Sequence, residues 1–190
     1  MRKKQGPTRQ RIIDAAYDLF WRAGFARSSM DGIAAHAGLT KRTLYTHFRS
    51  KDDLLAAVLT HHGGLAMERL RHIGDQMPSD RYAMIDSFFN QLAGWATATP
   101  RWTGSGFTRL VVELAELPGH PARAIARKAK ATTESWLADR LAKARVPRPK
   151  AHAREIMLLM EGSMALMLIH ADRAYIDTAA RAAKQLIRDS

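Results

Sequence analysis

The side chains with the clearest capacity for molecular recognition lie between Ser28 and Lys51. This stretch places hydroxyl and basic residues at the starts of two short predicted helices, where backbone N–H groups favour phosphate oxygens. Ser28 or Ser29 is expected to cap the first of these helices and Thr40 the second, and Ser29 and Thr40 are also expected to donate to phosphate. The exposed turn after Thr40 holds the residues expected to meet base edges, which are Lys41, Arg42 and Thr43. An Arg in this position can bind guanine O6 and N7 together, which contributes about 1–3 kcal/mol of discrimination.

Catalytic and cofactor chemistry finds little support in the residue types. The chain has no Cys, which excludes disulfides, Cys-ligated zinc, iron–sulfur clusters and a Cys nucleophile. Its eight His include the adjacent His61 and His62, but no His-x-x-x-His or His-Glu-x-x-His pair that would face one metal ion. The sequence also lacks a Gly-x-Ser-x-Gly motif and a Gly-rich phosphate loop in a strand–helix context. We therefore expect neither an enzyme nor a cofactor or metal site.

The positive charge is concentrated near the N-terminus. The 190 residues contain 30 Lys and Arg against 18 Asp and Glu, a formal net charge of +12. The first 51 residues carry eleven Lys and Arg against three Asp, so +8 of this charge lies in the first quarter of the chain. This asymmetry predicts a basic module that binds a polyanion, attached to a nearly neutral body. The basic start, Arg2 to Lys4, is expected to be either an arm that reaches DNA or a disordered solubilising tail.

Helical spacing of apolar residues extends along the whole sequence, and no stretch alternates as a β-strand does. We predict an all-α fold of about nine helices. They are expected at 8–24, 30–37, just after Thr40, 51–72, from about 81 to Thr99, around 107–114, and at 121–144, 150–170 and 173–188. The longest apolar stretch, 156–169, is shorter than the roughly 20 residues that span a bilayer, and no signal peptide begins the chain. We therefore expect a cytoplasmic protein without a membrane partner.

The second and third helices have the spacing of a helix-turn-helix. They are joined by Ala37-Gly38-Leu39-Thr40, in which Gly38 can supply the positive φ that the turn requires. Four apolar residues are expected to face the first helix, namely Ile33, Leu39, Leu44 and Phe48. In such a motif the second of the two helices enters the major groove of DNA.

These residues resemble the TetR family of bacterial transcriptional regulators. The resemblance covers about residues 9–58 and rests mainly on Ile33-Ala34, the run from Ala37 to Phe48, and Lys51-Asp52-Asp53-Leu54-Leu55. It implies that Tyr45 and His47 contact the DNA backbone and that Lys51 binds phosphate. Many family members have glycine where this chain has Arg42, so the operator sequence does not carry over.

The resemblance also implies a division of the chain and a function. A helix-turn-helix DNA-binding domain is expected over residues 1–51, and a helical effector-binding and dimerisation domain over 52–190. The implied function is that of a repressor, which a small hydrophobic or amphipathic effector releases from a palindromic operator. The alternative is a basic helical protein that coats DNA or anionic membranes without sequence preference.

The last two helices are expected to form a two-fold homodimer through about 150–188, as they do in that family. The helix at 150–170 is apolar nearly all round and must be buried on several sides. The predicted interface residues are Ile156, Met160, Gly162, Met164, Met167, Ile176, Ala180, Ala183 and Ile187. The alternative is that these helices form the ordinary core of a monomer.

The resemblance places an effector pocket in the body of the protein, between the N-terminal module and the dimer helices. Aromatic and Met side chains suit a hydrophobic ligand, although each is also a good core residue. The predicted pocket residues are Phe88, Trp95, Trp102, Phe107, Arg109, Glu113, Trp136 and Met160. Arg109 and Glu113 are either its polar anchors or ordinary surface charges.

Overall fold

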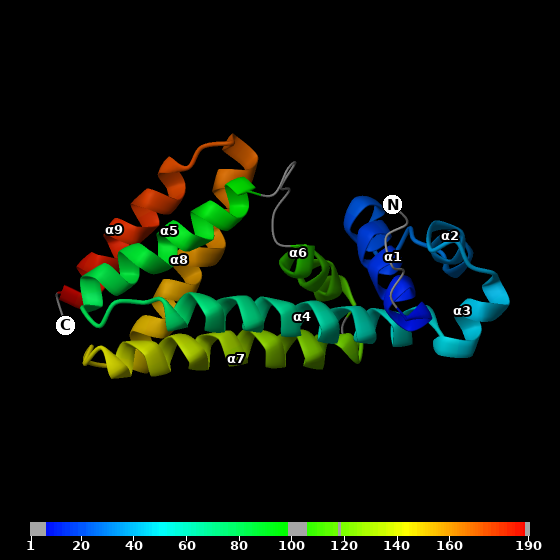
Figure 1. Ribbon diagram of the computed structural model, residues 1–190, viewed down its shortest axis with the longest axis horizontal. Helices are drawn as coiled ribbons and strands as arrows, with labels where there is room; N and C mark the ends of the chain where they lie inside the picture. Colours follow the sequence, from blue (N-terminus) through cyan, green and yellow to red (C-terminus); the bar gives the residue numbers. More distant parts are fainter. Residues whose placement is uncertain (1–6, 99–105, 118, 189–190) are drawn as a thin grey trace. The chain divides into compact units, whose positions relative to one another are not determined.

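The computed structural model describes residues 7–98, 106–117 and 119–188 (Figure 1). Its helices are α1 (Thr8–Ala23), α2 (Met30–His36), α3 (Lys41–His47), α4 (Lys51–Asp75), α5 (Arg81–Ala98), α6 (Gly106–Glu113), the short 3-10 helix η1 (Leu114–Glu116), α7 (Ala122–Lys143), α8 (Pro149–His170) and α9 (Ala174–Arg188). These ranges contain no strand, which confirms the predicted all-α class. None of the described helices is both long and apolar enough to cross a membrane. The basic start at Arg2 to Lys4 and the predicted pocket residue Trp102 lie outside the described residues.

The chain divides into two compact units. Unit 1 comprises Met1–Leu65 and Gly106–Lys128, and unit 2 comprises Ala66–Ser105 and Ala129–Ser190. Helices α4 and α7 therefore contribute residues to both units. The predicted boundary after residue 51 is a functional division and stays a prediction, since the structural division cuts across α4 and brings α6 into unit 1.

Unit 1 is built around the buried face of α1. Ile12, Ala16 and Phe20 recur at helical spacing and are fully buried, so α1 provides the surface on which the two short helices pack. Ile33 of α2, Leu44 of α3 and Phe48 just after α3 are buried, as predicted for residues that face the first helix. Leu39 in the turn is only half-buried. Short helices such as α2 and α3 depend on this tertiary packing for their stability.

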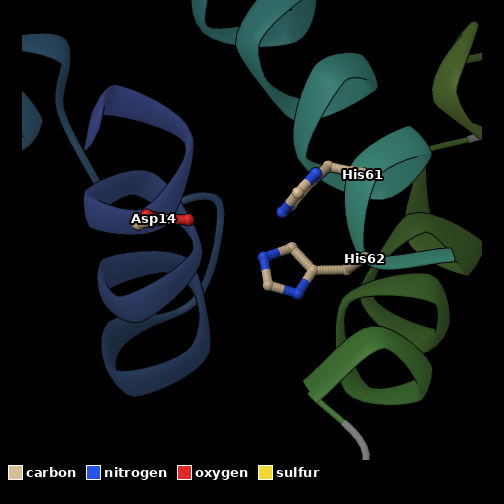
Figure 2. A group of neighbouring side chains, drawn as sticks. All are labelled: Asp14, His61 and His62. Carbon is tan, nitrogen blue, oxygen red and sulfur yellow. The ribbon is translucent and has the colours of Figure 1, made fainter. Parts of the chain in front are cut away.

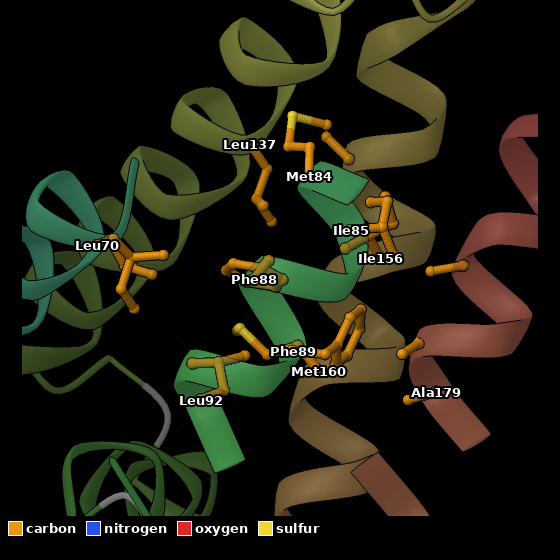
Figure 3. Packing of buried hydrophobic residues seen from close by; sticks show 14 of the residues in the cluster. Leu70, Met84, Ile85, Phe88, Phe89, Leu92, Leu137, Ile156, Met160 and Ala179 are labelled. Atoms are coloured by element: carbon orange, nitrogen blue, oxygen red, sulfur yellow. The ribbon is translucent and has the colours of Figure 1, made fainter. Parts of the chain in front are cut away.

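The described part of unit 2 holds an apolar cluster formed by parts of α4, α5, α7, α8 and α9 (Figure 3). Phe88 and Phe89 of α5 lie in this cluster together with Ile156 and Met160 of α8. Helix α5 begins where predicted, because Asp80 accepts hydrogen bonds from the N–H groups of Tyr82 (3.1 Å) and Ala83 (2.8 Å) and so caps the first turn.

Most of the predicted interface residues are buried within the protomer, so their contact with a second copy stays a prediction. Eight of the nine are buried in the protomer's own core, namely Ile156, Met160, Met164, Met167, Ile176, Ala180, Ala183 and Ile187. Gly162 alone among the nine is exposed. Three exposed apolar side chains of α8 lie on the same side as Gly162, namely Leu158 (70% exposed), Leu166 (41%) and Ile169 (73%), whereas the exposed Leu168 does not. We call this side of the helix the outer α8 face (Leu158, Gly162, Leu166 and Ile169).

Candidate DNA-binding interface

The two short helices of unit 1 are both capped by side-chain hydroxyls. Ser29 Oγ accepts a hydrogen bond from the N–H of Gly32 (3.1 Å) at the start of α2. Thr40 Oγ1 accepts one from the N–H of Thr43 (3.1 Å) at the start of α3, and the two threonine hydroxyls lie 2.8 Å apart. Since a hydroxyl can both donate and accept, the capping oxygens keep capacity for a phosphate contact.

The turn between α2 and α3 has the geometry that the sequence predicts. Gly38 adopts φ 63°, in the left-handed region that glycine enters without steric cost. The guanidinium of Arg11 in α1 donates a hydrogen bond from Nη2 to the carbonyl oxygen of Ala37 (2.8 Å) and so fastens the turn to α1. The pattern of the helix-turn-helix itself gives no sign of this contact, because Arg11 lies on the preceding helix.

Helix α3 presents one polar face to solvent. Its outward side chains are exposed, while Leu44 on the opposite side is completely buried. The exposed set contains the predicted contacts Lys41, Arg42, Tyr45 and His47, and also Thr46, which was not predicted; the predicted contact Thr43 is half-buried. Thr46 donates its hydroxyl to the carbonyl oxygen of Thr43 (2.7 Å), within the same turn. A buried anchor beneath an exposed polar face is what a helix needs in order to enter a groove without losing its support.

Lys41 is already engaged by an acidic neighbour. Its ammonium lies 2.9 Å from a carboxylate oxygen of Asp31 in α2, and the hydrogen bond and charge of Asp31 raise the pKa of Lys41 above its ordinary value. Both side chains are exposed, so the ion pair is screened and labile. A phosphate at this position would compete with Asp31 for the ammonium.

Lys51 is engaged with backbone carbonyls of unit 1. Its Nζ donates to the carbonyl oxygens of Phe25 (3.0 Å) and Ser28 (3.1 Å), with Ala26 at 3.4 Å, and it lies 4.4 Å from the centre of the Phe25 ring. Lys51 therefore holds the loop that joins α1 to α2. A phosphate contact for Lys51 stays a prediction, and it would draw the ammonium away from at least one of these carbonyls.

Glu113 also holds the loop between α1 and α2, by accepting hydrogen bonds from N–H groups of the loop backbone. Its carboxylate accepts hydrogen bonds from the backbone N–H of Phe25 (2.8 Å) and, at longer range, of Ala26 (3.3 Å). The Glu113 carboxylate lies close to the backbone at Gly24. An added Cβ there would lie 2.9 Å from Glu113 Oε1, and the φ of Gly24 is 88°. Glu113 was predicted as a polar anchor of an effector pocket or as a surface charge. No sequence signal links it to a loop so far back along the chain.

We expect Lys51→Met to destabilise the protein by about 1–3 kcal/mol, because hydrogen bonds from a charged donor are lost while the loop carbonyls remain. Binding to all DNA sequences should weaken alike, since the loop supports α2 and carries no base contact. Urea denaturation and mobility-shift titrations would measure the two effects. Lys150→Met, at an exposed position in α8, is the matched control and should change neither. Unaltered stability in Lys51→Met would contradict the supporting role.

The predicted pocket residues are divided between the two units. Phe107 and Glu113 belong to unit 1, whereas Phe88, Trp136 and Met160 lie in the core of unit 2. The rings of Phe88 and Trp136 are 6.3 Å apart, so these two are together, and the half-buried Trp95 carries the Arg69 guanidinium 4.5 Å above its ring. The side chain of Arg109 lies outside the described set. The effector pocket therefore stays a prediction.

A groove of about 500 Å³ lies elsewhere in unit 2, along α8 and α9. It is open to solvent and is lined by Arg148, His152, Glu155, Leu159, Ala182, Gln185 and Leu186. None of these is a predicted pocket residue.

The sequence matches known regulators most clearly over the N-terminal region just described. Residues 12–58 match the family of bacterial regulatory proteins known as the tetR family. The chain is 32% identical over 99 residues to the transcriptional regulator UidR of Escherichia coli strain K12, which is 49% of this chain and 50% of UidR. It is 48% identical over 52 residues to the transcriptional regulator SrpR of Pseudomonas putida, covering 27% of this chain and 24% of SrpR.

The whole fold also has solved counterparts. The crystal structure of the reduced form of NemR from Escherichia coli superposes with a TM-score of 0.82 over 94% of this chain and 96% of NemR, at 19% identity. This similarity concerns the fold. In sequence, the chain spans about half or less of the length of these curated relatives, and the match centres on α1 to α4.

Proposed function

We propose that the chain is a sequence-specific DNA-binding transcriptional regulator of the TetR family of bacterial regulatory proteins, which its residues 12–58 match. The observation that carries this proposal is the exposed face of α3. Arg42 and Tyr45 lie on it, with Leu44 anchored beneath and Thr40 capping the helix. An Arg on the solvent side of such a helix can read guanine, and the neighbouring polar side chains can set the register through phosphates.

The active form that we propose is a homodimer. Members of the family bind DNA as dimers, and the outer α8 face offers this chain an apolar surface for the purpose. Leu158, Gly162, Leu166 and Ile169 are spaced by three or four residues and so share one side of the helix. A two-fold copy packed there would hold two α3 helices for the half-sites of a palindrome, about one helical turn of DNA apart.

We propose further that the regulator is a repressor released by a small hydrophobic or amphipathic effector. The hydrogen bonds from Phe25 and Ala26 to Glu113 give α6 a direct hold on the loop between α1 and α2. A ligand that displaced α6 would break that hold and alter the support of α2. A differential affinity of a few kcal/mol between two such states is enough to change operator occupancy.

The test is selection of binding sites from a pool of random duplex DNA by the full chain, followed by mobility-shift titration. We expect a palindromic site that binds at least about 10³-fold more tightly than random DNA at physiological salt. Equal affinity for all sequences would contradict the proposal and favour a protein that coats DNA without preference.

Two variants separate base reading from phosphate contact in the same assay. Arg42→Ala should change the ranking of sites, with a loss of about 1–3 kcal/mol at the base pair that it contacts. Tyr45→Ala should weaken all sites by a similar factor, since a backbone contact carries no base information. If Arg42→Ala left the ranking of DNA sites unchanged, Arg42 would not be a base-contacting residue.

A further inference from the structure

A second cluster of polar side chains lies in unit 1, between α1 and α4. Asp14 of α1 faces His61 and His62 of α4, and one potential ligand atom from each residue lies within 4.8 Å of the other two. Figure 2 shows both imidazole rings directed from α4 toward the Asp14 carboxylate. The proposed DNA contacts use none of these three residues. Two imidazoles and a carboxylate form a donor set typical of divalent transition metals.

Gln10 closes one side of the cluster. Its amide nitrogen lies 2.8 Å from Asp14 Oδ1 and 3.0 Å from His61 Nε2, so the amide bridges the carboxylate and the imidazole. The two ends of a Gln amide exchange places by a half-turn of the last torsion. The same side chain could therefore offer its carbonyl oxygen to a cation held between Asp14 and His61.

His62 supplies an independent observation. Its ring stacks on Tyr17 with the centroids 3.5 Å apart and an angle of 14° between the planes, which covers a ring face and leaves the nitrogens at the edge. Among the described residues, its Nε2 is buried and has no hydrogen-bond partner. A buried polar atom without a partner is costly and calls for an explanation, and a metal ion at the edge of the ring would provide one.

Burial lowers the pKa of His62 to about 4, with a further contribution from His61 and an opposing one from Asp14.

We propose that Asp14, His61 and His62 form a binding site for a divalent transition-metal ion, with Zn²⁺ as its probe, that joins α1 to α4 within unit 1. Ligands around a tetrahedral Zn²⁺ lie about 3.4 Å apart, given metal–ligand bonds of about 2.0–2.1 Å. Small rotations of the side chains would bring the three groups to that spacing, and Asp14 is exposed and can rotate. The carbonyl oxygen of Gln10 or a water molecule would complete the coordination. The sequence patterns did not predict the site because they require both histidines one helical turn apart.

Calorimetric titration of the full chain with Zn²⁺ tests the site, using protein without appended histidines. The wild-type chain should bind one Zn²⁺ per protomer with a Kd in the micromolar range or below. Its Tm should rise by about 5 °C at saturation, because the ion binds the folded state. The Asp14→Asn and His61→Gln variants should each bind at least about ten-fold more weakly, which is the lower range for disturbing a metal site.

His72→Gln is the matched control. His72 is another histidine of α4; it is exposed, is paired with Gln76 at 3.0 Å, and is not part of the cluster. This variant should bind Zn²⁺ as the wild type does, and circular dichroism should report the same helix content for all four proteins. The proposal fails if the wild type does not bind Zn²⁺, or if Asp14→Asn and His61→Gln bind it unchanged. It also fails if His72→Gln loses as much affinity as they do. DNA binding does not enter any of these measurements.

Discussion

Replacing Gly162 with leucine is expected to leave the protomer folded while it prevents dimerisation and with it tight operator binding. A Cβ at Gly162 would meet no atom within 4 Å in the protomer, so the larger side chain has room there. The change even improves helix propensity by up to about 1 kcal/mol. On the outer α8 face, however, the absence of a side chain lets two helices approach closely, and leucine would hold them apart. In Gly162→Leu, the packing of the proposed dimer interface is therefore lost, whereas the packing within the protomer is kept.

The expected loss of operator affinity in Gly162→Leu follows from the two copies of α3 that the proposed dimer holds. A dimer whose second half-site binding is intramolecular gains about 10²–10⁴ in affinity over a single head, and Gly162→Leu should lose a factor of this order. Light scattering coupled to size-exclusion chromatography would report the oligomeric state, and mobility shift would report the affinity. Gly64→Leu is the control, because Gly64 is an exposed helical glycine of α4 with equally open surroundings. If Gly162→Leu stays dimeric, the interface lies elsewhere.

The Leu44→Ala variant is expected to lose about 2–5 kcal/mol of stability. Leu44 is completely buried, and it is the one buried residue within the seven of α3. Typical domains have only about 5–15 kcal/mol in total, and a helix of two turns does not persist without its packing. DNA binding should therefore be lost for every sequence, specific or random.

Chemical denaturation and mobility shift would measure the loss in Leu44→Ala. Thr46→Ala is a suitable comparison, because it lies two residues away on the exposed side and should change stability by less than about 0.5 kcal/mol. If Leu44→Ala retained both stability and DNA binding, Leu44 would not be what holds α3 in place.

The helix-turn-helix was predictable because its signals are local. Gly38 at the turn, Ser29 and Thr40 at the caps, and Leu44 at helical spacing each act within a few residues of their position. The structure confirms each of these structural roles. Their predicted contacts with DNA remain predictions, since a cap and a phosphate contact require the same residue types.

The roles of side chains that reach across the fold were not predictable in this way. Lys51 and Glu113 both hold the loop between α1 and α2, and the pairing follows from tertiary structure that no short motif encodes. For α8, periodicity indicated a helix buried on several sides but not which side faces its own core. The structure shows that Met160 and Met164 face the protomer's own core, whereas Leu158 and Ile169 are exposed.

The two-sided hold on the loop between α1 and α2 limits how freely the DNA-reading head can be exchanged between regulators. The first helices are continuous in sequence and could be expected to transfer as one piece. However, Glu113, which accepts a hydrogen bond from the backbone of their connecting loop, lies far downstream in α6. A chimera that joined residues 1–65 to another body would place those N–H groups against whatever residue that body carries in place of Glu113. We therefore expect that a functional exchange between regulators has to include α6 together with residues 1–65. These two segments are separated in the gene, so one continuous crossover would not transfer both.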